Sequence, residues 1–135
     1  MKTVLAFGTF DLLHPGHLSY LRQARKFGDQ LVVVIARDES VRKAKGHLPI
    51  LFEKDRKALV GSLSFVDHAV LGNAHDHFKV IKKIKPSVVC LGYDHAIDAS
   101  ILSQKLSDMK HLPRIVRAKA YRPNTYKSSK LKANR

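Results

Sequence analysis

Two histidines, His14 and His17, flank a Pro-Gly dipeptide in the segment LAFGTFDLLHPGHLSYL, residues 5–21. An apolar run ends at Gly8 just before them, and Pro15 is typical of the first turn of a helix. The pattern predicts a strand, a turn at Gly8, and a helix whose first turn contains His17. Because the first N–H groups of a helix have no partner within the helix, phosphate groups bind readily there. Histidines at that position can donate hydrogen bonds to phosphate oxygens, including those of a pentavalent transition state.

Two other readings of the histidine pair compete with phosphate binding. Zinc would need a third ligand, and no further His, Cys or Glu stands at ligand spacing nearby. The two histidines could also be purely structural. Phosphate binding is the interpretation that best uses the predicted strand–turn–helix setting.

The chain has 135 residues, of which 44% are apolar, and this predicts a single globular domain with a real core. No apolar run is long enough to span a membrane, and the N-terminal segment is expected to be an opening strand and not a secretory signal. The single cysteine, Cys90, lies in the apolar segment SVVCLG. We expect a buried structural thiol in a protein of the reducing cytoplasm.

The charge balance is strongly basic, with 25 Lys and Arg against 11 Asp and Glu, a formal charge of +14. From Met109 to the C-terminus the chain carries basic residues and no acidic one. Such a field attracts anions, whether nucleic acid, an acidic membrane or phosphorylated small molecules. Charge alone does not choose among them.

Short apolar runs typical of buried parallel strands alternate with helical patterns along the chain. The expected strands are residues 4–7, 31–36 and 87–92, with weaker candidates at 68–72 and 114–118. The expected helices follow Pro15, follow the charged segment FEKDRK, include Phe78, Ile81 and Ile84 on one face, and open at KSSKLK. This alternation predicts an α/β fold, a Rossmann-like doubly wound sheet of five parallel strands.

Ligands of such sheets bind beyond the carboxyl ends of the strands, so the segments after the strands are the candidate site. These segments are residues 8–17, 37–45, 72–77, 92–95 and 119–129.

The segment GTFDLLHPGH resembles the G-x-F-D-x-x-H-x-G-H signature of the cytidylyltransferase-like nucleotidyltransferases. Further resemblances lie in KDRKALV, which contains Arg56, in LGYD, and in YRPNTYKSSKLK, so they extend along essentially the whole chain. In the last segment Lys127-Ser128-Ser129 stands where Ser-Thr-Thr is more usual. Within the family, ARDESVRKAKGHLPI and LGYDH are most similar to the archaeal-type FAD synthases, which transfer AMP from ATP to FMN.

The resemblance implies that catalysis is carried by His14, His17, Lys45 and Arg122. The histidines would hold the α- and β-phosphates of the triphosphate during direct in-line attack, without a covalent intermediate. Lys45 would reach the phosphates or the incoming acceptor, with Lys43 as a second candidate, and Arg122 would clamp the β- and γ-phosphates.

The implied nucleotide-binding set adds further residues to His14, His17 and Arg122: Gly8, Thr9, Phe10, Asp11, Gly92, Tyr93, Asp94, Ser128 and Ser129. The amides of Thr9 and Phe10 would form a small nest for the triphosphate. Ser128 and Ser129 would bind phosphate at the start of the last helix, and Asp94 would lie nearer the nucleoside.

Acceptor binding is assigned to Lys45 and Arg56, and Asp11 is the candidate to orient Mg²⁺ or another divalent cation. Each role has a structural alternative. Asp11 could cap a turn, the lysines could be surface charge, and Arg56 could pair with Glu53 on its own helix. Ser128 and Ser129 could be plain N-caps, and Tyr93 could stack on a ring or line the sheet edge. The histidines outside the signature are expected on the surface or in loops, and among them His95 merits a test because it follows GYD.

Three functions are therefore compared. The first is FMN adenylyltransferase, with ATP and FMN as substrates and a homodimer as the expected assembly. The second is a transferase on the same scaffold that uses CTP or ATP with an alcohol phosphate or sugar phosphate. The third is a basic nucleic-acid-binding module, which the absence of Trp and of an aromatic-rich strand disfavours.

Overall fold

A parallel sheet forms the centre of the protein, described here from a computed structural model for residues 1–73, 76–93, 95 and 98–120. It is a 5-stranded sheet in the order β3-β2-β1-β4-β5, and all four neighbouring pairs are parallel. The strands are β1 (Thr3–Gly8), β2 (Gln30–Ile35), β3 (His68–Leu71), β4 (Val88–Leu91) and β5 (Arg114–Arg117). The predicted fold class is confirmed.

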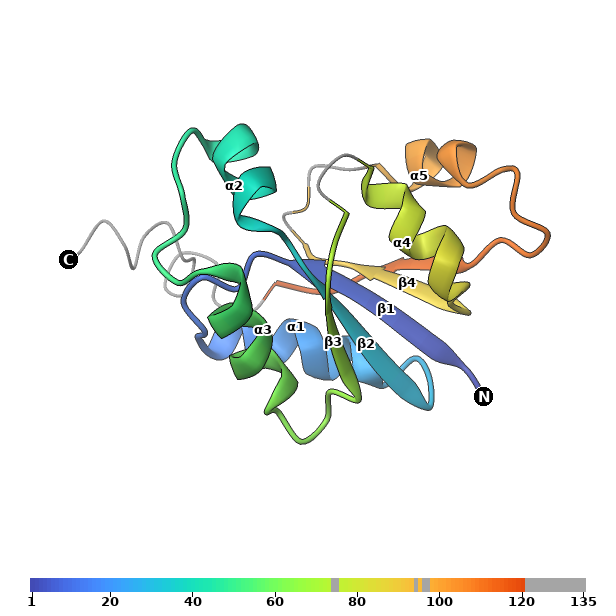
Figure 1. Ribbon diagram of the computed structural model, residues 1–135. Helices are drawn as coiled ribbons and strands as arrows, with labels where there is room; N and C mark the ends of the chain where they lie inside the picture. Colours follow the sequence, from blue (N-terminus) through green and yellow to red (C-terminus); the bar gives the residue numbers. More distant parts are fainter. Residues whose placement is uncertain (74–75, 94, 96–97, 121–135) are drawn as a thin grey trace.

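Helices cover both faces of the sheet (Figure 1). They are α1 (Pro15–Arg25), α2 (Asp38–Lys45), α3 (Glu53–Gly61), α4 (His77–Ile84) and α5 (Ala99–Lys105). In Figure 1, α1 and α3 lie on one face, α4 and α5 lie on the other, and α2 stands at the edge where β2 ends. None of the helices that the structure describes is both long and apolar enough to span a bilayer.

Two apolar clusters hold these layers together, one on each face. Successive residues of a strand point to opposite faces, so Val4 and Ala6 join one cluster while Leu5 joins the other. The first cluster includes Leu21 and Ala24 of α1 and the second includes Leu102 of α5. Cys90 is fully buried in the first cluster, and burial raises the pKa of its thiol to about 11, as suits the predicted structural thiol.

The sequence did not predict α2 or α5. Each has one buried residue, Val41 in α2 and Leu102 in α5, so neither shows the apolar repeat on which a sequence-based helix prediction rests. The last predicted helix, at KSSKLK, lies outside the described residues.

Candidate active site

The site lies where the chain leaves the carboxyl ends of β1 and β4. These neighbouring strands are the centre of the strand order: the connection from β1 leads to β2 on one side, and β4 continues the sheet on the other. Beyond this point the loops diverge, which is where open α/β sheets bind ligands. The segment after β1 and the 92–95 turn after β4 therefore share one edge, as the sequence predicted.

His14 is the N-cap of α1, with its backbone in the extended region and Pro15 at the first helical position. Its ring Nδ1 accepts a hydrogen bond from the Gly16 amide at 3.1 Å. The rings of His14 and His17 stack, with centroids 3.8 Å apart and planes inclined by 25°. The helix start thus fixes both imidazoles together at the end of the helix that favours anions.

Burial favours the neutral form of both histidines. Burial is the largest cause that lowers the pKa of His17, to about 3. Electrostatic repulsion of a second positive charge by His14 and Lys45 lowers this pKa further, and a hydrogen bond to the Leu12 backbone raises it. Burial also lowers the pKa of His14. In a neutral His14 ring whose Nδ1 accepts the Gly16 amide, the proton is on Nε2, which makes Nε2 a hydrogen-bond donor.

Lys45 is the last residue of α2, and its charge acts on His17 although the two residues belong to different elements. The structure therefore stacks two of the predicted catalytic residues, His14 and His17, and places Lys45 within electrostatic range of His17. Lys43 lies on the exposed surface of the same helix.

Gly8 permits a close approach at the turn after β1, and its predicted role in nucleotide binding stays a prediction. A Cβ at Gly8 would lie 2.5 Å from the ring of Phe10, so the close approach that this glycine permits is that of a side chain of the protein. Phe10 itself has a positive φ of 53° and is 3% exposed, and its ring meets His17 edge-on at 5.2 Å. The 8–10 turn therefore packs an aromatic ring edge-on against His17. The phosphate nest at the amides of Thr9 and Phe10 stays a prediction.

Asp11 is 1% exposed, and its two carboxylate oxygens accept hydrogen bonds from the amides of Ile50 and Leu51, each at 2.8 Å. It therefore joins the loop after β1 to the connection between α2 and α3. The metal and nucleotide roles of Asp11 stay predictions, and this geometry weighs against the metal role because both oxygens already receive N–H donors.

Arg56 is fully buried, which does not fit the predicted acceptor-binding role. Its guanidinium donates to the Leu51 carbonyl at 2.9 Å, to the Thr9 carbonyl at 2.8 Å and to the Asp38 carboxylate at 2.7 Å. The alternative pairing with Glu53 is also not observed. Arg56 instead connects α2, α3 and the loop after β1 from within.

Glu53 makes a separate set of contacts with the residues that follow β2. Its carboxylate accepts from the Asp38 amide at 2.9 Å and from Arg37 at 3.2 Å. The start of α2 and the start of α3 are therefore tied together by two carboxylates and two arginines.

The turn after β4 is built around Gly92 and His95. The His95 ring Nδ1 accepts from the Gly92 amide at 2.9 Å, and Arg117 of β5 donates to the carbonyls of Gly92 at 2.9 Å and His95 at 3.0 Å. A Cβ at Gly92 would lie 3.1 Å from the His95 ring. His95 thus forms part of the turn after β4, and a role for it in ligand binding stays a prediction. Tyr93 is half-buried, and its role as a stacking residue stays a prediction.

Tyr20 is a site-forming residue that the sequence analysis missed. Its hydroxyl accepts from the Phe7 amide at 3.0 Å and donates to the Cys90 carbonyl at 2.6 Å, and its ring meets His95 edge-on at 5.7 Å. It therefore bridges β1 and β4 at the point where the two strands diverge. The available signal was its spacing, because Tyr20 is three residues after His17 on the same helix.

Gln23 was missed in the same way. Its side-chain amide accepts from the Lys119 amide at 2.8 Å and donates to the Lys119 carbonyl at 3.0 Å. This pair holds the chain after β5 against α1. The predicted site residues Asp94, Arg122, Ser128 and Ser129 lie outside the described residues and stay predictions.

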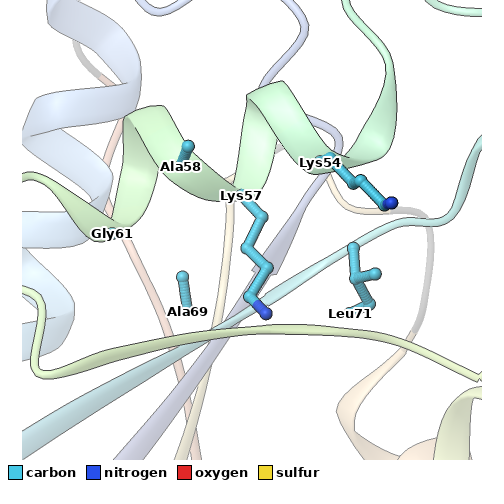
Figure 2. A pocket seen from close by; sticks show the side chains of 6 residues that line it. All are labelled: Lys54, Lys57, Ala58, Gly61, Ala69 and Leu71. Atoms are coloured by element: carbon cyan, nitrogen blue, oxygen red, sulfur yellow. The ribbon is translucent and has the colours of Figure 1, made fainter.

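Two further features of the described part of the chain bear on ligands. It contains no group of three or more His, Cys, Asp or Glu side chains placed to hold a metal ion. Figure 2 shows a surface hollow between α3 and the edge strand β3, lined by Lys54, Lys57, Ala58, Gly61, Ala69 and Leu71. None of these residues belongs to the predicted site.

With this geometry in place, comparison with known proteins identifies the class. The family model described as cytidylyltransferase-like matches residues 5–134, so the chain belongs to the cytidylyltransferase-like family. Curated relatives from two archaea are named FAD synthase. The protein of Archaeoglobus profundus is 44% identical over 96% of this chain and 82% of its own length. The protein of Thermoplasma acidophilum is 43% identical over 96% of this chain and 90% of its own length.

A solved structure supports the same fold. A protein of Thermoplasma volcanium, described as a lipopolysaccharide core biosynthesis protein, is 42% identical and superimposes with a TM-score of 0.86, covering 90% of this chain and 98% of that one. A universal stress protein of Archaeoglobus fulgidus, 12% identical with a TM-score of 0.55, shares the fold alone.

Proposed function

We propose that this chain is a FAD synthase, an FMN adenylyltransferase that transfers AMP from ATP to FMN and releases pyrophosphate. The observation that carries the proposal is the stacked histidine pair at the start of α1, in a chain whose curated relatives are named FAD synthase. An adenylyl transfer needs donors to phosphate oxygens at this edge of the sheet, and the pair supplies them.

The reaction is a direct displacement. A terminal phosphate oxygen of FMN attacks the α-phosphorus of ATP and forms the new P–O bond, while the bond from the α-phosphorus to the bridging oxygen breaks. Pyrophosphate leaves with the electron pair of that bond. No covalent intermediate on the protein is required, so the protein acts by positioning and by stabilising charge on the phosphate oxygens.

His14 and His17 are assigned to the α- and β-phosphates. A neutral imidazole donates one hydrogen bond, and the His14 Nε2–H is oriented by the bond between its Nδ1 and the Gly16 amide. Lys45 adds a positive charge close enough to act on His17, which suits it to the acceptor phosphate or the leaving group. The predicted phosphate contacts of Arg122, Ser128 and Ser129 complete this assignment.

Magnesium belongs to the proposal as the cation that accompanies ATP. The described residues supply no carboxylate cluster, and Asp11 is engaged by two amides, so we assign no protein cage to the metal. Triphosphate oxygens and water are the ligands that Mg²⁺ prefers in such sites. We further propose a homodimer acting in the cytoplasm, which sedimentation and fractionation of the native protein test.

The second candidate is a transfer to a sugar phosphate or alcohol phosphate, from CTP or ATP. The description of the Thermoplasma volcanium structure as a lipopolysaccharide core biosynthesis protein is the observation that favours it. The histidine pair serves both reactions, because it contacts the triphosphate and not the base or the acceptor.

Two incubations with magnesium and FMN separate these candidates, one with ATP and one with CTP, each analysed by chromatography. The proposal predicts FAD and pyrophosphate with ATP and no flavin dinucleotide with CTP. The absence of flavin product from both tubes, with the protein folded, contradicts it and directs the search to sugar and alcohol phosphates.

A further inference from the structure

Three large apolar side chains lie exposed within five residues of the connection between α2 and α3. Leu48 is 51% exposed, Ile50 46% and Phe52 60%. The other exposed large apolar residues of the described chain are scattered: Met1, Leu59, Ile101 and Leu112. Single exposed apolar residues are ordinary, but a local group of them marks a binding surface.

This surface is firmly anchored. The Asp11 carboxylate accepts from the amides of Ile50 and Leu51, and the buried Arg56 donates to the Leu51 carbonyl. The Phe52 carbonyl accepts from the amides of Asp55 and Arg56, 3.0 Å each, at the start of α3. Hydrogen bonds therefore hold the backbone of this segment in place, while the side chains of Leu48, Ile50 and Phe52 are exposed to water. A loop that only connects two helices needs no such fixing.

The same surface is close along the chain to Lys45 and is tied by hydrogen bonds to the loop that leads to the histidine pair. Asp11 belongs to the loop after β1 that leads to the histidine pair, and Leu48 follows Lys45 by three residues. Three residues span at most about 10 Å, so an acceptor phosphate near Lys45 lies within reach of the exposed group. FMN carries its phosphate at one end of the ribityl chain and its flat isoalloxazine ring at the other.

We propose that Leu48, Ile50 and Phe52 form the surface that receives the isoalloxazine ring of FMN, with its phosphate directed to Lys45 and the histidines. The inference rests on the proposed function and names the specificity element of its acceptor site. A ring of this kind gains from apolar and aromatic contact. A second copy of the chain fits less well, because three half-exposed side chains supply only part of the roughly 800 Å² per partner that a stable dimer buries.

The test is the variant Phe52→Ala, because Phe52 caps α3 through its backbone only and makes no side-chain cap bond. Its KM for FMN should rise about tenfold, with the KM for ATP unchanged. Phe52→Tyr keeps a ring and should restore FMN binding. Leu112→Ala is the matched control, since Leu112 is 55% exposed and lies on the approach to β5.

FMN binding is measured separately from turnover, by quenching of flavin fluorescence without ATP, so that the surface and the reaction are tested apart. Quenching by the wild-type protein and its loss in Phe52→Ala support the surface, even if no FAD forms and the proposed function fails. An FMN affinity that Phe52→Ala leaves unchanged overturns the surface. If Phe52→Ala leaves the FMN affinity unchanged but converts a dimer to a monomer, the surface is an interface between two copies of the chain.

Discussion

The histidine pair could be predicted from the sequence because its signature combines residue type with a start signal for a helix. Pro15 and Gly16 between the two histidines place both rings at one helix end, and the structure stacks them there. Their neutral state could not be predicted in the same way. It comes from burial, which depends on the residues that the fold gathers around them.

That burial has a consequence for stability. The pKa of His17 falls from its ordinary value of 6.5 to about 3 in the folded protein, and that of His14 is lowered too. Between pH 6.5 and pH 3 the His17 ring is protonated in the unfolded chain but not in the folded protein. The free energy of unfolding therefore falls as the pH falls from about 6.5 toward 3. We expect the free energy of unfolding in urea to decrease between pH 7 and pH 5, and to decrease less in His17→Asn.

The control for this prediction is His47→Asn, because His47 is exposed. Its removal should leave the wild-type pH dependence in place. Equal slopes in the wild-type protein and in His17→Asn would show that His17 titrates normally in the folded state.

Gly92 supplies a second prediction at this scale. A Cβ there would lie 3.1 Å from a His95 ring that is itself fixed on the Gly92 amide. Gly92→Ala should therefore disturb the turn and raise the KM for ATP more than the KM for FMN. Gly61→Ala is the matched control, since its Cβ would meet only the Ala69 methyl at 3.5 Å. An ATP KM unchanged in Gly92→Ala would separate this turn from nucleotide binding.

Residue roles that depend on contacts between distant parts of the chain could not be predicted from the sequence. The type of Arg56 and its place in KDRKALV suggested a ligand, but its partners Thr9 and Asp38 lie far away along the chain. Tyr20 was missed for the same reason, because its hydroxyl joins two strands that only the folded sheet brings together.

At the scale of elements, burial decides what the sequence reveals. The strands β1, β2 and β4 are continuous β-branched and apolar runs, which is typical of parallel strands covered on both faces. The edge strands β3 and β5 carry exposed residues and gave weaker signals. The helix α2 gave no sequence signal, because it lies at the end of the sheet and buries one residue. Its sequence therefore lacks the repeated apolar positions that predict a helix.

The attachment of α2 and α3 to the loop after β1 depends on Arg56. Arg56→Met removes the partner of Asp38 and leaves the Thr9 and Leu51 carbonyls without their donor. Breaking a buried ion pair from one side costs about 3 kcal/mol or more, so urea unfolding should show a loss of that size. Arg42→Met is the control, because Arg42 pairs with Glu39 at the surface and should change stability little. An Arg56→Met protein as stable as the wild type would contradict this role.

For the whole molecule, the strand order and the excess of basic charge act together. The loops that follow the neighbouring strands β1 and β4 lie at the same edge of the sheet, and the chain as a whole carries a formal charge of +14, which attracts polyanions. ATP and FMN are both anions, so one field serves donor and acceptor. The family and the fold were predicted from the sequence, whereas the anchoring of the exposed apolar surface at residues 48–52 was visible only in the folded protein.

The most direct test is the rate of FAD formation from FMN and ATP by the wild-type protein and by His17→Ala. Urea unfolding is measured for both proteins, and equal midpoints show that the variant is folded as stably as the wild type. Loss of a group that acts on the transferring phosphate typically lowers the rate by about 10²–10⁴-fold. We expect FAD from the wild-type protein and turnover at least about a hundredfold slower in the variant. Near-normal turnover in His17→Ala, or no FAD from the folded wild-type protein, would contradict adenylyl transfer at the histidine pair.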